Sequence, residues 1–298
     1  MIPQGTHSYL SLLSGNNRSL VWWPVLLGLV VLYLPTYYEL ANTVWSGDDS
    51  ESVHGPIVLM IILWLFWHKR VEFFQAVDQP VTASGSILLV FGLMLYVLGR
   101  SQEILIFEAG SQVPVLIGVI LVCRGKAALK PYLFPILFLV FLVPLPGFLV
   151  DALTTALKHQ VSDVVEHILY WLGYPIARSG VTLVIGPYQL LVADACSGIN
   201  SMFSLSAIGI LYIYLKGKQP LLQNGLLLIS ILPIAFIANI GRVIALTLIT
   251  YYFGDNAGQE FVHDFAAIAE FVIAMLILFL VDYLLGRIVI LRRRYVNV

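Results

Sequence analysis

Long apolar runs, separated by short polar segments, dominate the pattern of this chain. A hydrocarbon core of about 30 Å needs roughly 20 apolar helical residues to cross it. On that basis the pattern predicts an all-α polytopic membrane protein with about eight transmembrane helices. The second and third runs are short, and a re-entrant or buried segment is the alternative for Pro56–Trp67. The first run has no small-x-small cleavage site, so we expect it to be retained as an anchor. The eight predicted spans are Leu20–Tyr38, Pro56–Trp67, Ser86–Gly99, Ile104–Val122, Tyr132–Val150, Ser197–Leu215, Leu221–Tyr252 and Phe265–Leu285.

Composition supports a membrane protein and excludes several other classes. Of the 298 residues, 59% are hydrophobic and only 11% are charged, and the mean hydropathy is +0.91. A soluble domain carries about 25% charged residues. A soluble globular enzyme, a disordered chain and a nucleic-acid-binding protein are therefore excluded.

The positive charges lie mainly on one side of the predicted spans. If the N-terminus is cytoplasmic, 12 of the 16 Lys and Arg residues fall in inner segments, which is the bias that membrane proteins show. Arg100, Lys158, Arg178 and Arg242 remain for the spans and the outer side. We therefore expect both termini in the cytoplasm. The 12 inner residues are Arg18, Lys69, Arg70, Arg124, Lys126, Lys130, Lys216, Lys218, Arg287, Arg292, Arg293 and Arg294.

A long outer segment, residues 151–196, joins the fifth and sixth predicted spans. Apolar residues recur at helical spacing over 151–174, which predicts an amphipathic helix in the membrane interface or, as the alternative, a helix packed on its neighbours. Two β-rich runs, Val181–Ile185 and Tyr188–Val192, flank Gly186-Pro187 and predict a short β-hairpin on the outer face. The second run leads directly to the start of the sixth span.

One of the two cysteines, Cys196, lies at the predicted N-terminus of the sixth span. A helix N-terminus favours anions, and therefore a thiolate, while the backbone N–H groups of Ser197 and Gly198 can hold an oxyanion. The alternative is an inert buried thiol, which is how we interpret Cys123. We expect no disulfide scaffold.

A charged residue, Arg242, lies late in the apolar run Leu221–Tyr252. At 1.5 Å per residue, the helix places it about 30 Å beyond Leu222, at the outer edge of the hydrocarbon. Ionisable groups at such a depth are functional candidates. The alternative is a structural ion pair, for which Glu270 is the expected partner. Asn239, one turn earlier, is expected to donate a hydrogen bond to the backbone or to substrate.

A histidine, His263, precedes the eighth span and is followed by Asp264. Histidine is the usual proton shuttle near neutral pH; a helix-capping or interfacial histidine is the alternative. Glu260 and His263 are two possible metal ligands without a third. We therefore predict neither a metal nor a cofactor.

The predicted topology brings Cys196, Arg242 and His263 to one membrane face. A thiolate, a proton shuttle and a fixed cation are the parts needed for acyl transfer through a thioester. Cys196 would attack a peptide carbonyl, Arg242 would hold the oxyanion or the carbonyl, and His263 would protonate the leaving amine. Asp194 is expected to orient the site.

Three motifs resemble those of the exosortase/archaeosortase family: Ala193-Asp194-Ala195-Cys196-Ser197-Gly198-Ile199, Asn239-Ile240-Gly241-Arg242-Val243, and His263 before a last span. Asp194 stands where many relatives have Glu. Gly173-Tyr174-Pro175 and Gly186-Pro187-Tyr188 are nearest to the exosortase B subgroup. The resemblance covers most of the chain, and we expect one domain, 1–298, with an outer-face insertion, 151–196, and a catalytic core, 190–275.

The resemblance implies a cysteine transpeptidase or protease in the bacterial inner membrane, whose active site faces the periplasm. Its substrates would be exported proteins with a C-terminal sorting tail, consisting of a Pro-Glu-Pro-like motif, a transmembrane helix and a basic cluster. The resemblance also implies a link to exopolysaccharide production or export and, since the C-terminal domain of some relatives is missing here, a separate periplasmic exosortase-associated protein as partner. The lipid bilayer is a further expected partner. We expect no binding of nucleic acid.

Two other functions stay open from the residues alone. The first is a transporter or a flippase-like component of exopolysaccharide export. The end of the fifth span is interrupted by Pro144 and Pro146, and a pathway through the membrane could be lined by Arg242 and Glu270. Ser197 with His263 would give a rhomboid-like serine protease, although the Gly-x-Ser-x pattern is missing.

Overall fold

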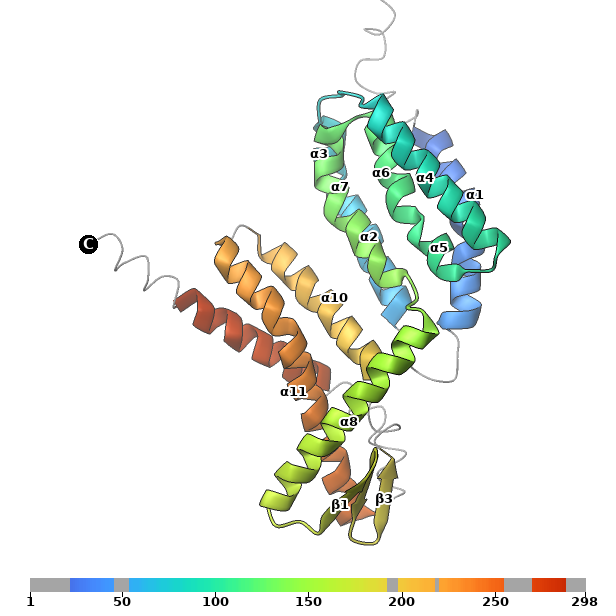
Figure 1. Ribbon diagram of the computed structural model, residues 1–298. Helices are drawn as coiled ribbons and strands as arrows, with labels where there is room; N and C mark the ends of the chain where they lie inside the picture. The colour runs from blue at the N-terminus through green and yellow to red at the C-terminus, as the bar shows by residue number, and fades with distance from the viewer. Residues whose placement is uncertain (1–21, 46–53, 192–197, 218–219, 255–269, 288–298) are drawn as a thin grey trace, which may run out of the picture.

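The computed structural model describes the chain except for residues 1–21, 46–53, 192–197, 218–219, 255–269 and 288–298. It is mostly helical, with one small sheet at one end (Figure 1). Two of its apolar helices, Gly55–His68 and Phe203–Lys216, are shorter than a full span. The prediction of an all-α polytopic membrane protein is confirmed. Four described helical stretches are long and apolar enough to cross a membrane: Trp22–Val44, Thr82–Ser101, Leu105–Cys123 and Leu221–Phe253.

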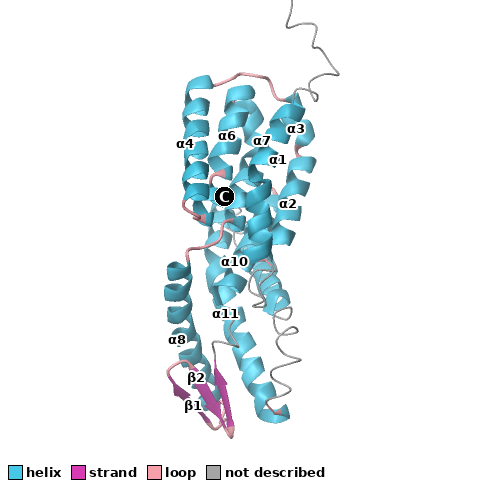
Figure 2. Cartoon of the chain, turned by 90° about the vertical axis from the view of Figure 1, so that its right-hand side faces the viewer, coloured by secondary structure: helices cyan, strands magenta, loops and turns pink. Residues whose placement is uncertain are grey.

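The first half of the chain forms a group of neighbouring helices (Figures 1 and 2). Buried polar contacts connect them: Thr36 donates to the carboxylate of Glu108 over 2.6 Å, and Tyr37 donates to Gln112 over 2.6 Å. Glu108 is only 2% exposed, so its carboxylate depends on such donors. The helices are α1 (Trp22–Glu39), α2 (His54–His68), α3 (Arg70–Gln75), α4 (Thr82–Ser101), α5 (Leu105–Gly110), α6 (Gln112–Cys123) and α7 (Lys126–Phe138).

Glycines bring α4 and α6 into backbone contact. Gly85, Gly92 and Gly99 are buried at seven-residue spacing on α4. A Cβ on Gly92 would lie 2.8 Å from the backbone N of Val115, and one on Gly118 would lie 2.7 Å from that of Leu89. Small residues of this kind allow membrane helices to approach closely.

We expect Gly92→Ala to destabilise the protein, since the added methyl group meets backbone that cannot rotate away. Overpacking costs typically about 1–3 kcal/mol. Thermal unfolding in a mild detergent measures the effect. Gly28→Ala on α1 is the matched control, because nothing lies within 4 Å of its Cβ position. Equal melting temperatures for the two variants would contradict the tight α4–α6 contact.

The fifth predicted span, Tyr132–Val150, is corrected by the structure. Helix α7 begins earlier, at Lys126, and continues into a 3-10 turn, Leu139–Leu142, where the helix ends. Pro144 and Pro146 follow, and proline cannot donate the backbone hydrogen bonds that a helix needs. The next helix, α8 (Gly147–Trp171), therefore begins before the predicted start at Asp151.

Helix α8 packs on a three-stranded antiparallel sheet. The strands are β1 (Ile176–Ser179), β2 (Thr182–Ile185) and β3 (Tyr188–Leu191), in that order. The predicted hairpin is confirmed as β2 and β3, and β1 is an addition that the sequence analysis missed. Gly180 and Gly186 take positive φ angles of 66° and 55° in the two turns, which glycine adopts without strain.

The buried face of α8 differs from the predicted one. Val161, Val165 and Leu169 are fully buried, and they pack on the sheet and on the end of a later helix. The helical spacing over 151–174 places Ile168 and Leu172 on one apolar face with Val161, but both are exposed. The alternative interpretation, a helix packed on its neighbours, is therefore confirmed for the second half of α8.

The last part of the chain forms three neighbouring helices: α10 (Gly198–Lys216), α11 (Leu221–Phe253) and a helix over 270–287. Asp282, 6% exposed, joins them near one end. It accepts hydrogen bonds from Tyr212 over 2.7 Å and from Gln223 over 3.0 Å, and it pairs with Lys216. One buried carboxylate thus connects all three helices.

Candidate functional site

Helix α11 passes from one hydrophobic core to another at Arg242. Before this residue, Ile234, Ala235 and Ala238 pack with α10 and the helix over 270–287. After it, Val243 and Leu246 pack with α8 and the sheet. Arg242 therefore lies at the boundary between two packed parts, the bundle of α10, α11 and 270–287 and the unit of α8 and the sheet. Figure 1 shows how these elements are arranged.

The guanidinium of Arg242 is buried and paired. It is 5% exposed, and the partner Glu270 is 6% exposed. Nη1 of Arg242 donates to Oε2 of Glu270 over 3.1 Å. Glu270 is the first described residue of its helix. The ion pair that was expected as the structural alternative is confirmed.

The start of α10 lies at the same level as Arg242. The two helices are antiparallel and joined by a short connection, and a Cβ on Gly209 would meet the side chain of Ile231. Gly198 is 11 residues before Gly209, and Arg242 is 11 residues after Ile231. At 1.5 Å per residue each lies about 16 Å from that contact along its own helix, on the same side.

The structure describes four of the predicted site residues. Gly198 begins α10, Asn239 is fully buried one turn before Arg242, and Arg242 pairs with Glu270. The remaining predicted site residues, Cys196, His263, Asp194, Ser197 and Asp264, lie outside the described residues.

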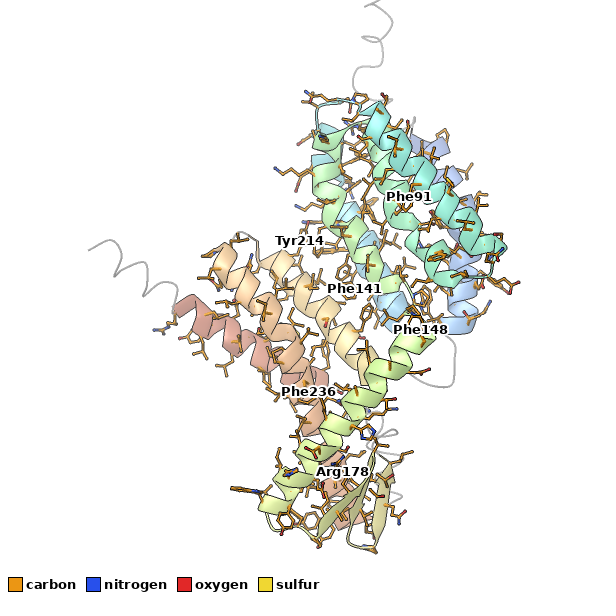
Figure 3. The ribbon with its side chains drawn as sticks, viewed as in Figure 1. Phe91, Phe141, Phe148, Arg178, Tyr214 and Phe236 are labelled. Carbon is orange, nitrogen blue, oxygen red and sulfur yellow. The ribbon has the colours of Figure 1, made fainter. Side chains whose placement is uncertain are left out.

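A pocket of about 260 Å³ opens next to the first turns of α10. Phe203 and Ser204 of α10 line it, about 8–9 Å along the helix from Gly198. Figure 3 labels Phe141 and Phe148 in this part of the molecule. This pocket could not be predicted from the sequence, because its walls come from segments far apart in the chain. They include Trp45, Gly55, Phe141, Pro144 and Asp151.

An acidic cluster on α8 has the ligand types of a metal site, but an arginine occupies it. Asp163, Glu166 and His167 lie close together. Arg178 of β1, labelled in Figure 3, donates to Asp163 over 2.8 Å and to Glu166 over 3.2 Å. These ion pairs attach β1 to α8. They explain why acidic residues gather here.

The protein is therefore a helical polytopic membrane protein with a buried Arg–Glu pair between a helix bundle and a small sheet-bearing unit. The family model described as transmembrane exosortase matches residues 44–280. The chain belongs to this family and is a membrane transpeptidase of the exosortase kind. No curated protein and no solved structure matches it.

Proposed function

We propose that this protein is a cysteine transpeptidase that cleaves the C-terminal sorting tail of exported proteins at the outer face of the bacterial inner membrane. The supporting observation is the buried Arg242, held by Glu270 at the level where α10 begins. The family match favours this enzyme over a transporter and over a serine protease.

The connection between Cys196 and α10 is short. Two peptide units separate Cys196 from Gly198, and consecutive Cα atoms are 3.8 Å apart, so the two Cα atoms are at most about 7.6 Å apart. Since Gly198 lies level with Arg242 on the neighbouring helix, the thiol and the guanidinium are candidates for one site.

The chemistry divides among three residues. Sγ of Cys196, whose proton has passed to His263, attacks the scissile carbonyl carbon as a thiolate, and Arg242 donates to the oxyanion that forms. The C–N bond then breaks, and the leaving amine takes a proton from His263. The thioester is released when an acceptor, which His263 deprotonates, attacks the same carbon and Sγ leaves. The acceptor is an amine, a lipid, a glycan or water.

The arrangement of the pocket fits an extended peptide beside this site. Trp45, Phe141 and Phe203 give it aromatic walls, and aromatic-lined grooves accept proline-containing segments. We propose that the Pro-Glu-Pro-like part of the tail binds there. A periplasmic active site, cytoplasmic termini, a link to exopolysaccharide export and a separate associated protein belong to the same proposal.

Covalent trapping tests the nucleophile directly. The full-length protein in detergent is mixed with a tail-derived peptide, quenched in acid, digested and mapped by mass spectrometry. We expect an acyl adduct on the peptide that contains Cys196, since a thioester survives the quench. Cys123, at the far end of α6, is an internal control that should stay unmodified. An adduct on Ser197, or equal modification of both cysteines, would contradict the proposal.

A further inference from the structure

A groove of about 1140 Å³ separates the two groups of helices. Residues of α2, α3 and α7 line one side, and residues of α10 and α11 line the other (Figure 1). The stacked rings of Phe134 and Tyr214, with centroids 3.6 Å apart, join the two sides; Tyr214 is labelled in Figure 3. The groove is at the opposite end of α10 from Gly198, so it is separate from the candidate site.

The lining changes from polar to apolar along all four long helices. On each of α2, α7, α10 and α11 a polar lining residue is followed about one turn deeper by an apolar one, while Ala127, Leu215 and Leu221 also line the groove near the helix ends. Leu65, for example, lies one turn below Lys69, and Leu228 lies one turn below Asn224. The polar mouth consists of His68, Lys69, Glu72, Lys130, Tyr214 and Asn224. The apolar interior includes Leu65, Phe134, Ile210, Ile213 and Leu228.

The mouth carries a net positive charge. Lys69 and Glu72 form an ion pair at 2.6 Å, and this pair is neutral as a unit. Lys130 is exposed on α7, and no ion pair among the described residues includes it. The ammonium group of Lys130 therefore remains for an anion at the mouth of the groove.

We propose that this groove binds an anionic phospholipid. The phosphate would lie at Lys130, and the acyl chains would lie along Leu65, Ile213 and Leu228. Basic pockets between membrane helices are typical sites for anionic lipid head groups. The charge disfavours the transmembrane helix of a sorting tail, because its basic cluster would meet Lys130. The proposal does not depend on the proposed transpeptidase activity.

Lipid binding to the full-length protein, stripped of lipid in a neutral detergent, tests this site. Native mass spectrometry measures binding of dioleoyl phosphatidylglycerol, with dioleoyl phosphatidylcholine for comparison. We expect tighter binding of phosphatidylglycerol, weakened at least fivefold by Lys130→Gln. Lys126→Gln is the matched control, since Lys126 is one turn earlier on α7 and does not line the groove. Leu228→Trp, which fills the apolar part, should weaken binding of both lipids.

Several outcomes would overturn the site. Equal binding of the two lipids would remove the role of charge, and equal losses in Lys130→Gln and Lys126→Gln would indicate general surface attraction. If glycerol 3-phosphate displaces bound phosphatidylglycerol as effectively as added phosphatidylglycerol does, the groove is a site for free anions. A tail-derived transmembrane peptide could also be tested. If Leu228→Trp weakens binding of this peptide but not of phosphatidylglycerol, the occupant of the groove is a protein helix.

Discussion

Replacement of Cys196 with alanine is expected to abolish processing of a co-expressed protein that carries a sorting tail. Loss of a covalent nucleophile removes the acyl-enzyme route altogether, and in proteases it costs several orders of magnitude, so we expect a decrease of about 10⁴-fold or more. Immunoblots of the substrate measure processing, and the amount of enzyme in the membrane fraction should be unchanged.

The other variants in this series separate the competing mechanisms. Cys123→Ala and Ser197→Ala should process normally. Loss of processing in Ser197→Ala, with normal processing in Cys196→Ala, would indicate the serine protease. A protein that tolerates Cys196→Ala but loses its function in Glu270→Gln would fit the transporter instead.

Substitution at the Arg242–Glu270 pair is expected to affect stability and processing differently. Glu270→Gln leaves the buried guanidinium without its carboxylate, and breaking such a pair costs about 3–5 kcal/mol. Arg242→Gln leaves the carboxylate alone and also removes the donor to the oxyanion, which costs about 10²–10³-fold in rate. The double variant Arg242→Gln/Glu270→Gln should be more stable than either single variant, because no isolated charge stays buried, yet it should still fail to process substrate.

A double-mutant cycle measures the coupling, with thermal unfolding for stability and substrate cleavage for activity. Arg178→Gln is the matched control, because Arg178 also pairs with two carboxylates but is partly exposed. Exposed pairs contribute about 0–1 kcal/mol, so this variant should lose much less stability than the variants of the Arg242–Glu270 pair and should still process substrate. Recovery of processing in the double variant would show that Arg242 acts only as a structural partner of Glu270.

The sequence predicted the central ion pair because few charges occur in the apolar runs. A buried guanidinium needs a carboxylate, and the eighth predicted span holds two: Glu270 near its outer end, on the side of Arg242, and Asp282 near its inner end. The structure confirms the pair. The roles of Cys196 and His263 stay predictions, since both lie outside the described residues.

Other features could not be read from the sequence, for physical reasons. Strand β1 is only four residues long and contains Arg178, so its pattern is not that of a typical strand; pairing with β2 and ion pairs to α8 stabilise it. The buried face of α8 depends on where the sheet and α11 pack, which local periodicity does not fix. The groove and the pocket form between distant segments, so no local pattern marks them.

The length of α11 has a consequence for the proteins that this site would cleave. The helix continues for 11 residues from Arg242 to Phe253, a rise of about 16 Å, and α8 and the sheet stand beside that stretch. Under the proposed function, a folded substrate domain on the side of the sheet would have to clear this height before its tail could reach the level of Arg242. At about 3.3 Å per extended residue, the spacer between the domain and the scissile bond needs roughly five residues.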